Sequence, residues 1–310
     1  MSEPPLIAGP VAVPRRPAVA PPRGAWDTHA HIFGPWRQFP FAAGRGYTPP
    51  DAPVEKYLAL LDHLGFAYGV IVQGNAHGYD NRVVLDALER YPRRFRGVAI
   101  TDAIAPATLR DWHRVGLRGL RFHLFSTAGR PGYVRGVGLD VFEAFRPAMR
   151  ELGMVMQVWC DWRLLPDVAA TLRGIAAELP VVIDHMLNIP AERGVDDPCF
   201  QALLRLVGEG HAYAKLSAPY RLSSRFPDYP DARAFHDALL RANPERLLWG
   251  TDWPHPSIDA DVMPDDGQLV DLFHQWTPDE RARQLILVET PGRLFDRIRR
   301  RNPVIPVGSW

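Results

Sequence analysis

Two histidines separated by one residue are the strongest chemical feature of this sequence. They lie in Asp27-Thr28-His29-Ala30-His31, at the end of a short apolar segment typical of a β-strand. Side chains at positions i and i+2 of a strand point to the same side, so the two imidazoles present their nitrogens to one small volume. Histidines are also found as ordinary core or surface residues, so the rest of the chain must decide the role of this pair.

The elements that would position the pair alternate regularly along the chain. Eight short apolar segments are expected to be strands: Trp26–Phe33, Tyr68–Gln73, Phe95–Ile100, Leu117–Phe125, Met154–Cys160, Val181–Met186, Ala212–Ser217 and Leu247–Trp253. Amphipathic segments between them are expected to be helices: Val54–Leu64, Asn81–Tyr91, Ala107–Val115, Leu139–Leu152, Leu164–Leu179, Phe200–Gly208 and Ala232–Ala242, with one or two more after Gln268. Pro147 is expected to kink or shorten its helix.

This alternation predicts an α/β fold, a (β/α)8 barrel formed by a single domain over residues 26–310. A doubly wound open sheet is the alternative, but it would place a glycine-rich turn after the first strand, where this chain has His-Ile-Phe-Gly-Pro. Residues 1–25 are rich in proline, which blocks a helix and favours an extended arm. Such an arm could pack on a neighbouring subunit of a homo-oligomer.

Composition narrows the partners of the protein. The chain has 310 residues, and 36 Lys and Arg against 35 Asp and Glu give a net charge of +1, so no basic field would attract nucleic acid. Its two cysteines, Cys160 and Cys199, do not form a C-x-x-C pair, which is typical of a reducing compartment and favours the cytoplasm. The sequence has no run of 18 apolar residues, so no membrane span is expected.

The polar residues gather where the expected strands end, and in a barrel these ends surround the catalytic mouth. From this set, His29, His31, His185 and Asp252 are the candidate centre. Asp184 directly precedes His185, and strand alternation predicts that it points the other way. Five further histidines fall on expected helices or at strand starts and are expected to be solvated: His63, His113, His211, His236 and His274.

The four candidate residues allow two chemistries. Imidazoles and a carboxylate suit zinc or another borderline divalent ion such as manganese, which would activate a water at an open coordination position. Without a metal, Asp252 can act as a general base on water while His29, His31 and His185 stabilise developing negative charge. The spacing alone does not separate these alternatives.

Five segments of the chain together resemble the amidohydrolase superfamily and, within it, the 2-pyrone-4,6-dicarboxylate lactonase branch. The resemblance extends from about Trp26 to Phe295, and its segments are 27–35, 72–81, 118–122, 182–186 and 248–256. It implies a distorted (β/α)8 barrel that hydrolyses a lactone derived from aromatic compounds.

The resemblance also implies roles for the candidate centre. The aspartate that ends the eighth strand, here Asp252, would be the general base, and His29, His31 and His185 would polarise the lactone carbonyl. In that branch the histidines work without a divalent metal, whereas relatives in the superfamily use one. Gln157 occupies a position where a metal-binding relative could place a histidine, which favours the metal-free alternative.

A carboxylated substrate requires fixed cations, and guanidinium groups suit carboxylates because they form two parallel hydrogen bonds. Arg121 and Arg221 match the substrate arginines of the family, and four more residues are expected in the same pocket: His77, Tyr47, Asn75 and His255.

One position departs from the family pattern. Thr127 stands where the lactonase branch has a second carboxylate-binding arginine, and Arg130 or Arg135 of the same segment could replace it. Losing one such contact would cost a dicarboxylate about 2–5 kcal/mol of binding free energy. Trp159 also stands where a tyrosine that contacts substrate is expected. These differences leave the lactone itself open.

Two other functions stay open. One is a zinc- or manganese-dependent relative, either a lactonase for a sugar-acid or muconolactone substrate or a decarboxylase of an aromatic acid. The other is a barrel that binds a partner without catalysis. That function predicts erosion of the polar set, yet the candidate centre and both arginines are present.

Overall fold

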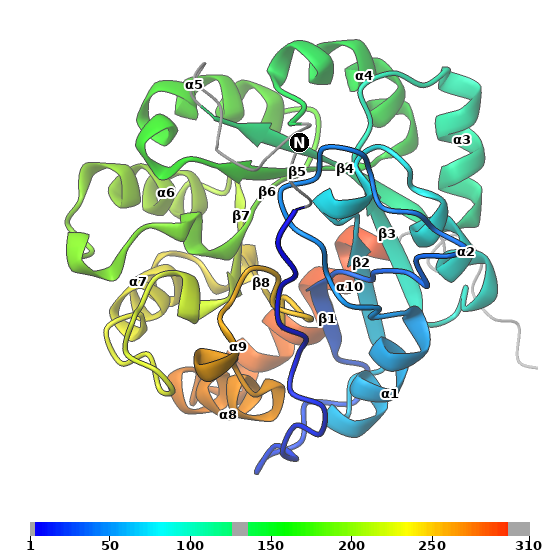
Figure 1. Cartoon of the computed structure of the whole chain (residues 1–310). Helices are drawn as coiled ribbons and strands as arrows, with labels where there is room; N and C mark the ends of the chain where they lie inside the picture. Colours follow the sequence, from blue (N-terminus) through cyan, green and yellow to red (C-terminus); the bar gives the residue numbers. More distant parts are fainter. Residues whose placement is uncertain (1–3, 126–135, 297–310) are drawn as a thin grey trace, which may run out of the picture.

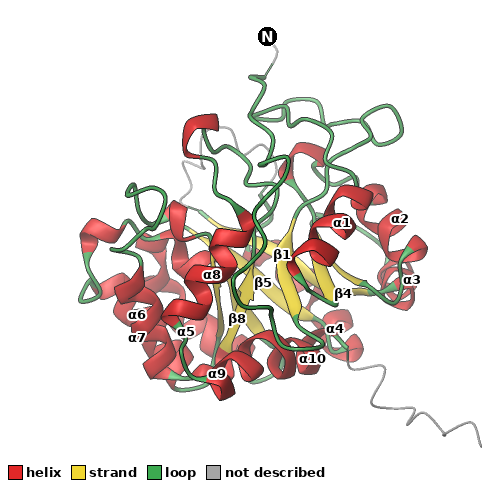
Figure 2. Cartoon of the chain, turned by 90° about the horizontal axis from the view of Figure 1, so that it is seen from below, coloured by secondary structure: helices red, strands yellow, loops and turns green. Residues whose placement is uncertain are grey.

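The computed structural model describes residues 4–125 and 136–296 and contains a barrel of eight parallel strands surrounded by helices (Figure 1, Figure 2). The strands are paired in chain order, which confirms the predicted (β/α)8 fold. They are β1 (Trp26–Ala30), β2 (Tyr68–Val72), β3 (Phe95–Ala99), β4 (Leu117–Leu124), β5 (Val155–Cys160), β6 (Val181–Ile183), β7 (Tyr213–Ser217) and β8 (Leu247–Gly250).

Helices follow the strands on the outside of the barrel. They are α1 (Val54–Leu64), α2 (Arg82–Arg90), α3 (Pro106–Val115), α4 (Leu139–Leu152), α5 (Leu165–Ala176), α6 (Pro198–Gly208), α7 (Arg233–Ala242), α8 (Asp266–Trp276), α9 (Glu280–Gln284) and α10 (Thr290–Phe295). A π-helical segment, Leu285–Glu289, joins α9 to α10. No helix in the described parts of the chain is both long and apolar enough to cross a membrane.

Pro147 was expected to kink or shorten α4, and the helix is not shortened. The helix continues to Leu152 and ends at Gly153, which has a left-handed φ of 63°. Phe142, Phe145 and Met149 are buried on both sides of the proline, and this packing holds the helix together despite the hydrogen bond that proline cannot donate.

The barrel closes between β1 and the residues that follow β8. The backbone N–H of His31 donates to the carbonyl of Trp253 at 2.6 Å, and the N–H of Asp252 donates to the carbonyl of His29 at 2.8 Å. The H-x-H motif and the segment that contains Asp252 therefore pair with each other where the barrel closes. This pairing brings both histidines of β1 next to the aspartate.

Several strands are shorter at their carboxyl ends than predicted. β6 ends at Ile183 and β8 at Gly250, whereas the apolar patterns continue to Met186 and Trp253. His185 and Asp252 have φ values of 51° and 63°, and these left-handed conformations cannot continue an extended strand. Side-chain alternation consequently fails at the mouth, which is the open end of the barrel at the carboxyl ends of the strands.

The proline-rich arm is extended, as predicted, and crosses in front of the mouth (Figure 1). The N–H of Ile7 donates to the carbonyl of Thr48 at 3.0 Å, and the N–H of Arg15 donates to Asp265 at 3.0 Å. A Cβ atom on Gly267 would lie only 1.9 Å from the carbonyl oxygen of Arg15, so this close approach requires glycine. The arm thus packs on its own barrel, and its contact with a neighbouring subunit stays a prediction.

Two of the five histidines expected to be solvated are buried, and the other three are half-buried. His236 on α7 has its Nε2 2.8 Å from Oγ1 of Thr277, and its ring packs against Phe273 and Trp276. His274 on α8 is also buried. The prediction was wrong for this pair because it did not account for the packing of α8 over α7 and of the arm over α8.

Burial of His236 should make the protein sensitive to acid. Burial lowers its pKa from 6.5 to about 3, so unfolding takes up a proton at any pH between these values. Its contribution to stability is complete above pH 6.5 and is lost as the pH falls toward 3, by about 1.4 kcal/mol per pH unit. Urea denaturation between pH 6 and pH 4 should show a shallower pH slope for His236→Phe than for the parent. Equal pH slopes in the parent and His236→Phe would contradict a role of His236 in acid sensitivity.

Candidate active site

A cavity of about 710 Å³ opens at the mouth of the barrel. The strand ends contribute polar residues, whereas the N-terminal arm contributes an apolar edge formed by residues 5–8. From the barrel and its loops, the lining residues are His31, Gly46, Tyr47, Asn75, Arg121, Trp159, His185, Arg221, Asp252, Pro256, Ser257, Ile258, Asp259 and Ala260.

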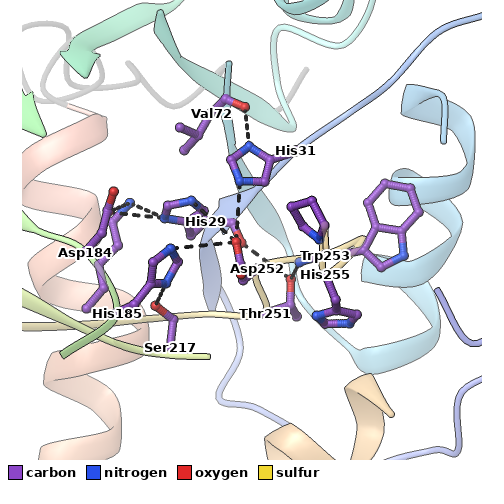
Figure 3. A network of polar contacts seen from close by, with 12 residues as sticks. His29, His31, Val72, Asp184, His185, Ser217, Thr251, Asp252, Trp253 and His255 are labelled. Carbon is purple, nitrogen blue, oxygen red and sulfur yellow. Dashed lines mark hydrogen bonds and ion pairs between the residues drawn. The ribbon is translucent and has the colours of Figure 1, made fainter. Parts of the chain in front are cut away.

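Three imidazoles converge on one oxygen of Asp252 (Figure 3). The Nε2 atoms of His31, His29 and His185 lie 3.4, 3.7 and 3.8 Å from Oδ1 of Asp252. All four side chains are buried, and neither Oδ1 of Asp252 nor Nε2 of His29 has a hydrogen-bond partner among the described residues. Such unpartnered polar atoms require a partner, and a water molecule in the site can supply it. The structure therefore brings together the four residues predicted as the centre.

The second oxygen of Asp252 is held firmly by residues of the turn Pro219–Arg221, which follows β7. Arg221 donates from Nε at 2.9 Å and lies 2.8 Å away through Nη2, and the hydroxyl of Tyr220 donates at 2.9 Å. Burial would raise the pKa of Asp252, but Arg221 and His185 outweigh burial and hold it well below the usual value. Asp252 is therefore ionised, with one oxygen restrained and the other facing the histidines.

Asp184 points into the same centre, so the prediction that it faces away was wrong. Its Oδ2 accepts hydrogen bonds from Nε of Arg121 at 3.0 Å and from Nε2 of Gln157 at 3.1 Å. Its Oδ1 lies 3.3 Å from Nδ1 of His29. Asp184 is still extended, with φ −75° and ψ 146°, whereas His185 has a left-handed φ of 51°, so the two side chains do not alternate. Arg121 and other cations outweigh burial and hold the pKa of Asp184 well below its usual value.

Lys215 on β7 is a site residue that the sequence analysis missed. Its side chain is fully buried, and Nζ lies 2.9 Å from Oε1 of Gln157, 3.0 Å from the carbonyl of Thr28 and 3.1 Å from Nδ1 of His29. Burial lowers the pKa of Lys215 to about 8, and Asp184, 3.5 Å away, opposes that shift. A lysine inside an apolar strand was the available signal, because a buried ammonium group must be paired.

The predicted substrate-binding residues divide into two groups. Tyr47, Asn75, Arg121 and Arg221 lie on the cavity wall, although each arginine is also paired with a buried carboxylate. Trp159 lines the cavity as well, with its ring centroid 5.3 Å from the guanidinium carbon of Arg121. Thr127, Arg130 and Arg135 lie outside the described residues.

His77 and His255 are not among the residues that line the cavity. His77 packs against the rings of Phe33 and Phe41, and its Nε2 accepts a hydrogen bond from the N–H of Gly34. His255 is fully buried, with Nδ1 2.9 Å from the hydroxyl of Tyr220 and Nε2 3.2 Å from Asp266. Both histidines therefore stabilise the loops around the mouth, whereas the sequence analysis expected them to contact substrate.

Two overlapping groups have donor atoms close enough to hold a metal ion: His29 with Asp184 and His185, and His29 with His31 and Asp252. The first group does not fit well, because the ammonium group of Lys215 lies within 3.5 Å of both His29 and Asp184. The second group fits by donor type, since imidazole nitrogens and a carboxylate oxygen suit zinc. Its two unpartnered atoms, Nε2 of His29 and Oδ1 of Asp252, lie 3.7 Å apart.

Comparisons with known proteins identify the family. The amidohydrolase family model matches residues 26–297, so the chain belongs to the amidohydrolase family, as the sequence motifs predicted. The 4-sulfomuconolactone hydrolase of Rhizobium radiobacter is 40% identical over 297 residues, covering 94% of this chain and 96% of the relative. The 2-pyrone-4,6-dicarboxylate hydrolase of Comamonas testosteroni is 36% identical over 294 residues, covering 92% and 94%.

The fold is also shared with a solved structure. The crystal structure of a probable 2-pyrone-4,6-dicarboxylic acid hydrolase from Acinetobacter baumannii, with citric acid bound, superposes with a TM-score of 0.75. Its sequence is 26% identical, and the match covers 88% of this chain and 99% of that chain.

Proposed function

We propose that this chain is a hydrolase that opens the ring of a carboxylated lactone, with 2-pyrone-4,6-dicarboxylate or a closely related lactone as substrate. The observation that carries the proposal is the ionised Asp252, which has one oxygen held by Arg221 and the other surrounded by three imidazoles. This arrangement supplies a base next to hydrogen-bonding groups, which ester hydrolysis requires. The names of the relatives from Rhizobium radiobacter and Comamonas testosteroni support a lactone as the substrate class.

In the proposed reaction Asp252 takes a proton from a water molecule through Oδ1. The hydroxide oxygen then bonds to the lactone carbonyl carbon, and the carbonyl π electrons move to oxygen to give a tetrahedral oxyanion. Hydrogen bonds from imidazole N–H groups that face this oxygen stabilise that charge. When the carbonyl re-forms, the ring C–O bond breaks, and the protonated Asp252 gives its proton to the leaving oxygen. The product carries a new carboxylate and an enol or alcohol.

The cavity wall supports a negatively charged substrate. Arg121 and Arg221 both line the cavity, and guanidinium groups recognise carboxylates by charge-assisted hydrogen bonds. Tyr47 and Asn75 add polar groups to the same wall, and Trp159 offers a ring surface. A planar pyrone ring that bears carboxylates matches this combination of aromatic and cationic groups.

Turnover of a small lactone panel tests the function. We expect the ultraviolet absorbance of 2-pyrone-4,6-dicarboxylate to be lost when protein is added, with monocarboxylate lactones and muconolactones assayed in parallel. A methyl ester of the same lactone is the matched control, and it should react more slowly because it lacks the charge that Arg121 and Arg221 would bind. No turnover across the panel would refute the proposal. Preference for monocarboxylates would indicate that Thr127 has removed one anion contact.

A second candidate function is a zinc- or manganese-dependent amidohydrolase reaction on a sugar-acid lactone, a muconolactone or an aromatic acid. Nδ1 of His31 must donate to the carbonyl of Val72 at 2.9 Å, so a neutral His31 directs a lone pair toward Asp252. A cation held by His29, His31, His185 and Asp252 would bind both the lone pair of His31 and the carboxylate of Asp252. It would also supply Lewis-acid activation. Stoichiometric metal whose removal abolishes turnover would favour this function over the first.

A further inference from the structure

Lys215 contacts His29, one of the three histidines around Asp252. The proposed reaction leaves the role of Lys215 unassigned. An ammonium group has three N–H donors and no acceptor. Three partners surround Nζ within 3.1 Å: the carbonyl of Thr28, Oε1 of Gln157 and Nδ1 of His29. Oδ1 of Asp184 is also near, 3.5 Å from Nζ and 3.3 Å from Nδ1 of His29, but it makes no hydrogen bond with the described residues. The three donors of Lys215 therefore meet three hydrogen-bond partners.

Two of these partners can only accept. The Thr28 group is a carbonyl oxygen, and the Gln157 group must be the amide oxygen because the Nε2 of that side chain donates to Asp184 at 3.1 Å. The third N–H of Lys215 is then directed at Nδ1 of His29, 3.1 Å away. A nitrogen that accepts this hydrogen bond carries a lone pair, so the proton of a neutral His29 is on Nε2.

We infer that Lys215 is a positioning residue that fixes His29 as the Nε2–H tautomer, which makes His29 a hydrogen-bond donor toward the reacting oxygen and prevents it from binding a metal through Nε2. The donor role rests on the proposed lactone hydrolysis, but the tautomer does not. Nε2 of His29 is buried, has no partner among the described residues and lies 3.7 Å from Asp252 Oδ1. A carbonyl oxygen placed among these side chains would accept a hydrogen bond from Nε2–H of His29.

The two histidines of the H-x-H motif then have opposite polarity. His31 donates through Nδ1 to Val72, so its neutral ring offers a lone pair at Nε2, whereas His29 offers an N–H at the same atom. His31 can accept a hydrogen bond from one O–H of the attacking water while Asp252 takes the other proton, and His29 can donate a hydrogen bond to the oxyanion. Identical residues in one motif are thereby given different tasks by their outer partners.

The tautomer of His29 can be measured on the full-length protein without substrate. NMR spectra of protein with ¹³C,¹⁵N-labelled histidine distinguish an Nε2–H ring from an Nδ1–H ring, and the signals of His29 are assigned by their absence in His29→Gln. We expect the Nε2–H form in the parent. An Nδ1–H ring would overturn the inference, whether or not any lactone is hydrolysed.

Variants of Lys215 test its control over His29. Lys215→Met removes the donor, so the His29 signals should move toward a mixture of tautomers, whereas Lys215→Arg should keep the parent form. Zinc affinity, measured by equilibrium dialysis with zinc chloride, should rise about tenfold in Lys215→Met because Nε2 becomes available. Unchanged signals and unchanged zinc affinity in a folded Lys215→Met protein would overturn the inference. If Lys215→Met does not fold, the tautomer of His29 in the parent spectrum decides, and an Nδ1–H ring there overturns the inference.

Discussion

Asp252→Asn should lower kcat for lactone hydrolysis by about 10²–10⁴-fold, the usual contribution of a positioned general base. Asparagine has nearly the same volume, but its amide cannot accept a proton from water at neutral pH. The substitution also removes the charge that balances Arg221. Steady-state kinetics with the lactone turned over fastest in the panel would measure the loss, with circular dichroism to confirm that the variant is folded.

Asp259→Asn is the matched control for this experiment. Asp259 lines the same cavity but lies in the exposed loop after β8, and the ion pairs of the three imidazoles are made with Asp184 and Asp252. Its replacement changes the charge of the cavity by the same amount and should leave kcat close to that of the parent. If Asp252→Asn retained the activity of the control, Asp252 would not be the base, and the proposed reaction would be wrong.

The fold could be predicted because it depends on local patterns. Short β-branched segments and amphipathic helices recur along the chain, and the helices Val54–Leu64 and Leu139–Leu152 have the predicted bounds. Errors arose where packing overrides local preference. Pro147 does not shorten its helix because apolar contacts hold the helix on both sides, and His236 is buried because a later helix covers it.

The candidate centre was only partly predictable. His29 and His31 point the same way because they belong to a strand, and alternation is reliable inside strands. It failed for Asp184 and His185 because His185 has a left-handed φ of 51°, and no local pattern indicates that turn. The partners of Lys215 come from β1, β5 and the end of β6, so only the closed barrel brings them together.

The roles of the arginines show a similar limit. Arg121 and Arg221 were predicted from family resemblance to bind substrate, and both reach the cavity wall. The structure adds that each is paired with a buried carboxylate, Asp184 or Asp252. Because these pairs connect residues far apart in the sequence, their energetic role could not be inferred from composition or spacing. Each arginine can therefore affect the catalytic carboxylates as well as a substrate.

Asp184→Asn should lower the free energy of unfolding by about 3–5 kcal/mol, because it leaves buried charge without compensation. Asp184 is the buried anion that faces both Arg121, at 2.9 Å, and Lys215, at 3.5 Å. An asparagine can keep one hydrogen bond to Arg121, but it cannot balance two cations. Urea denaturation at pH 7, where the low pKa of Asp184 keeps it ionised in the parent, would measure the loss.

Two further variants separate charge burial from a general effect of the substitution. Asp62→Asn removes an exposed ion pair with Arg94 and should cost no more than about 1 kcal/mol. Combining Asp184→Asn with Lys215→Met removes one buried charge of each sign, so the double variant should lose less stability than the sum of the two single variants. If Asp184→Asn were as stable as Asp62→Asn, Asp184 would not be holding the two cations, and the buried network beneath His29 would need a different electrostatic explanation.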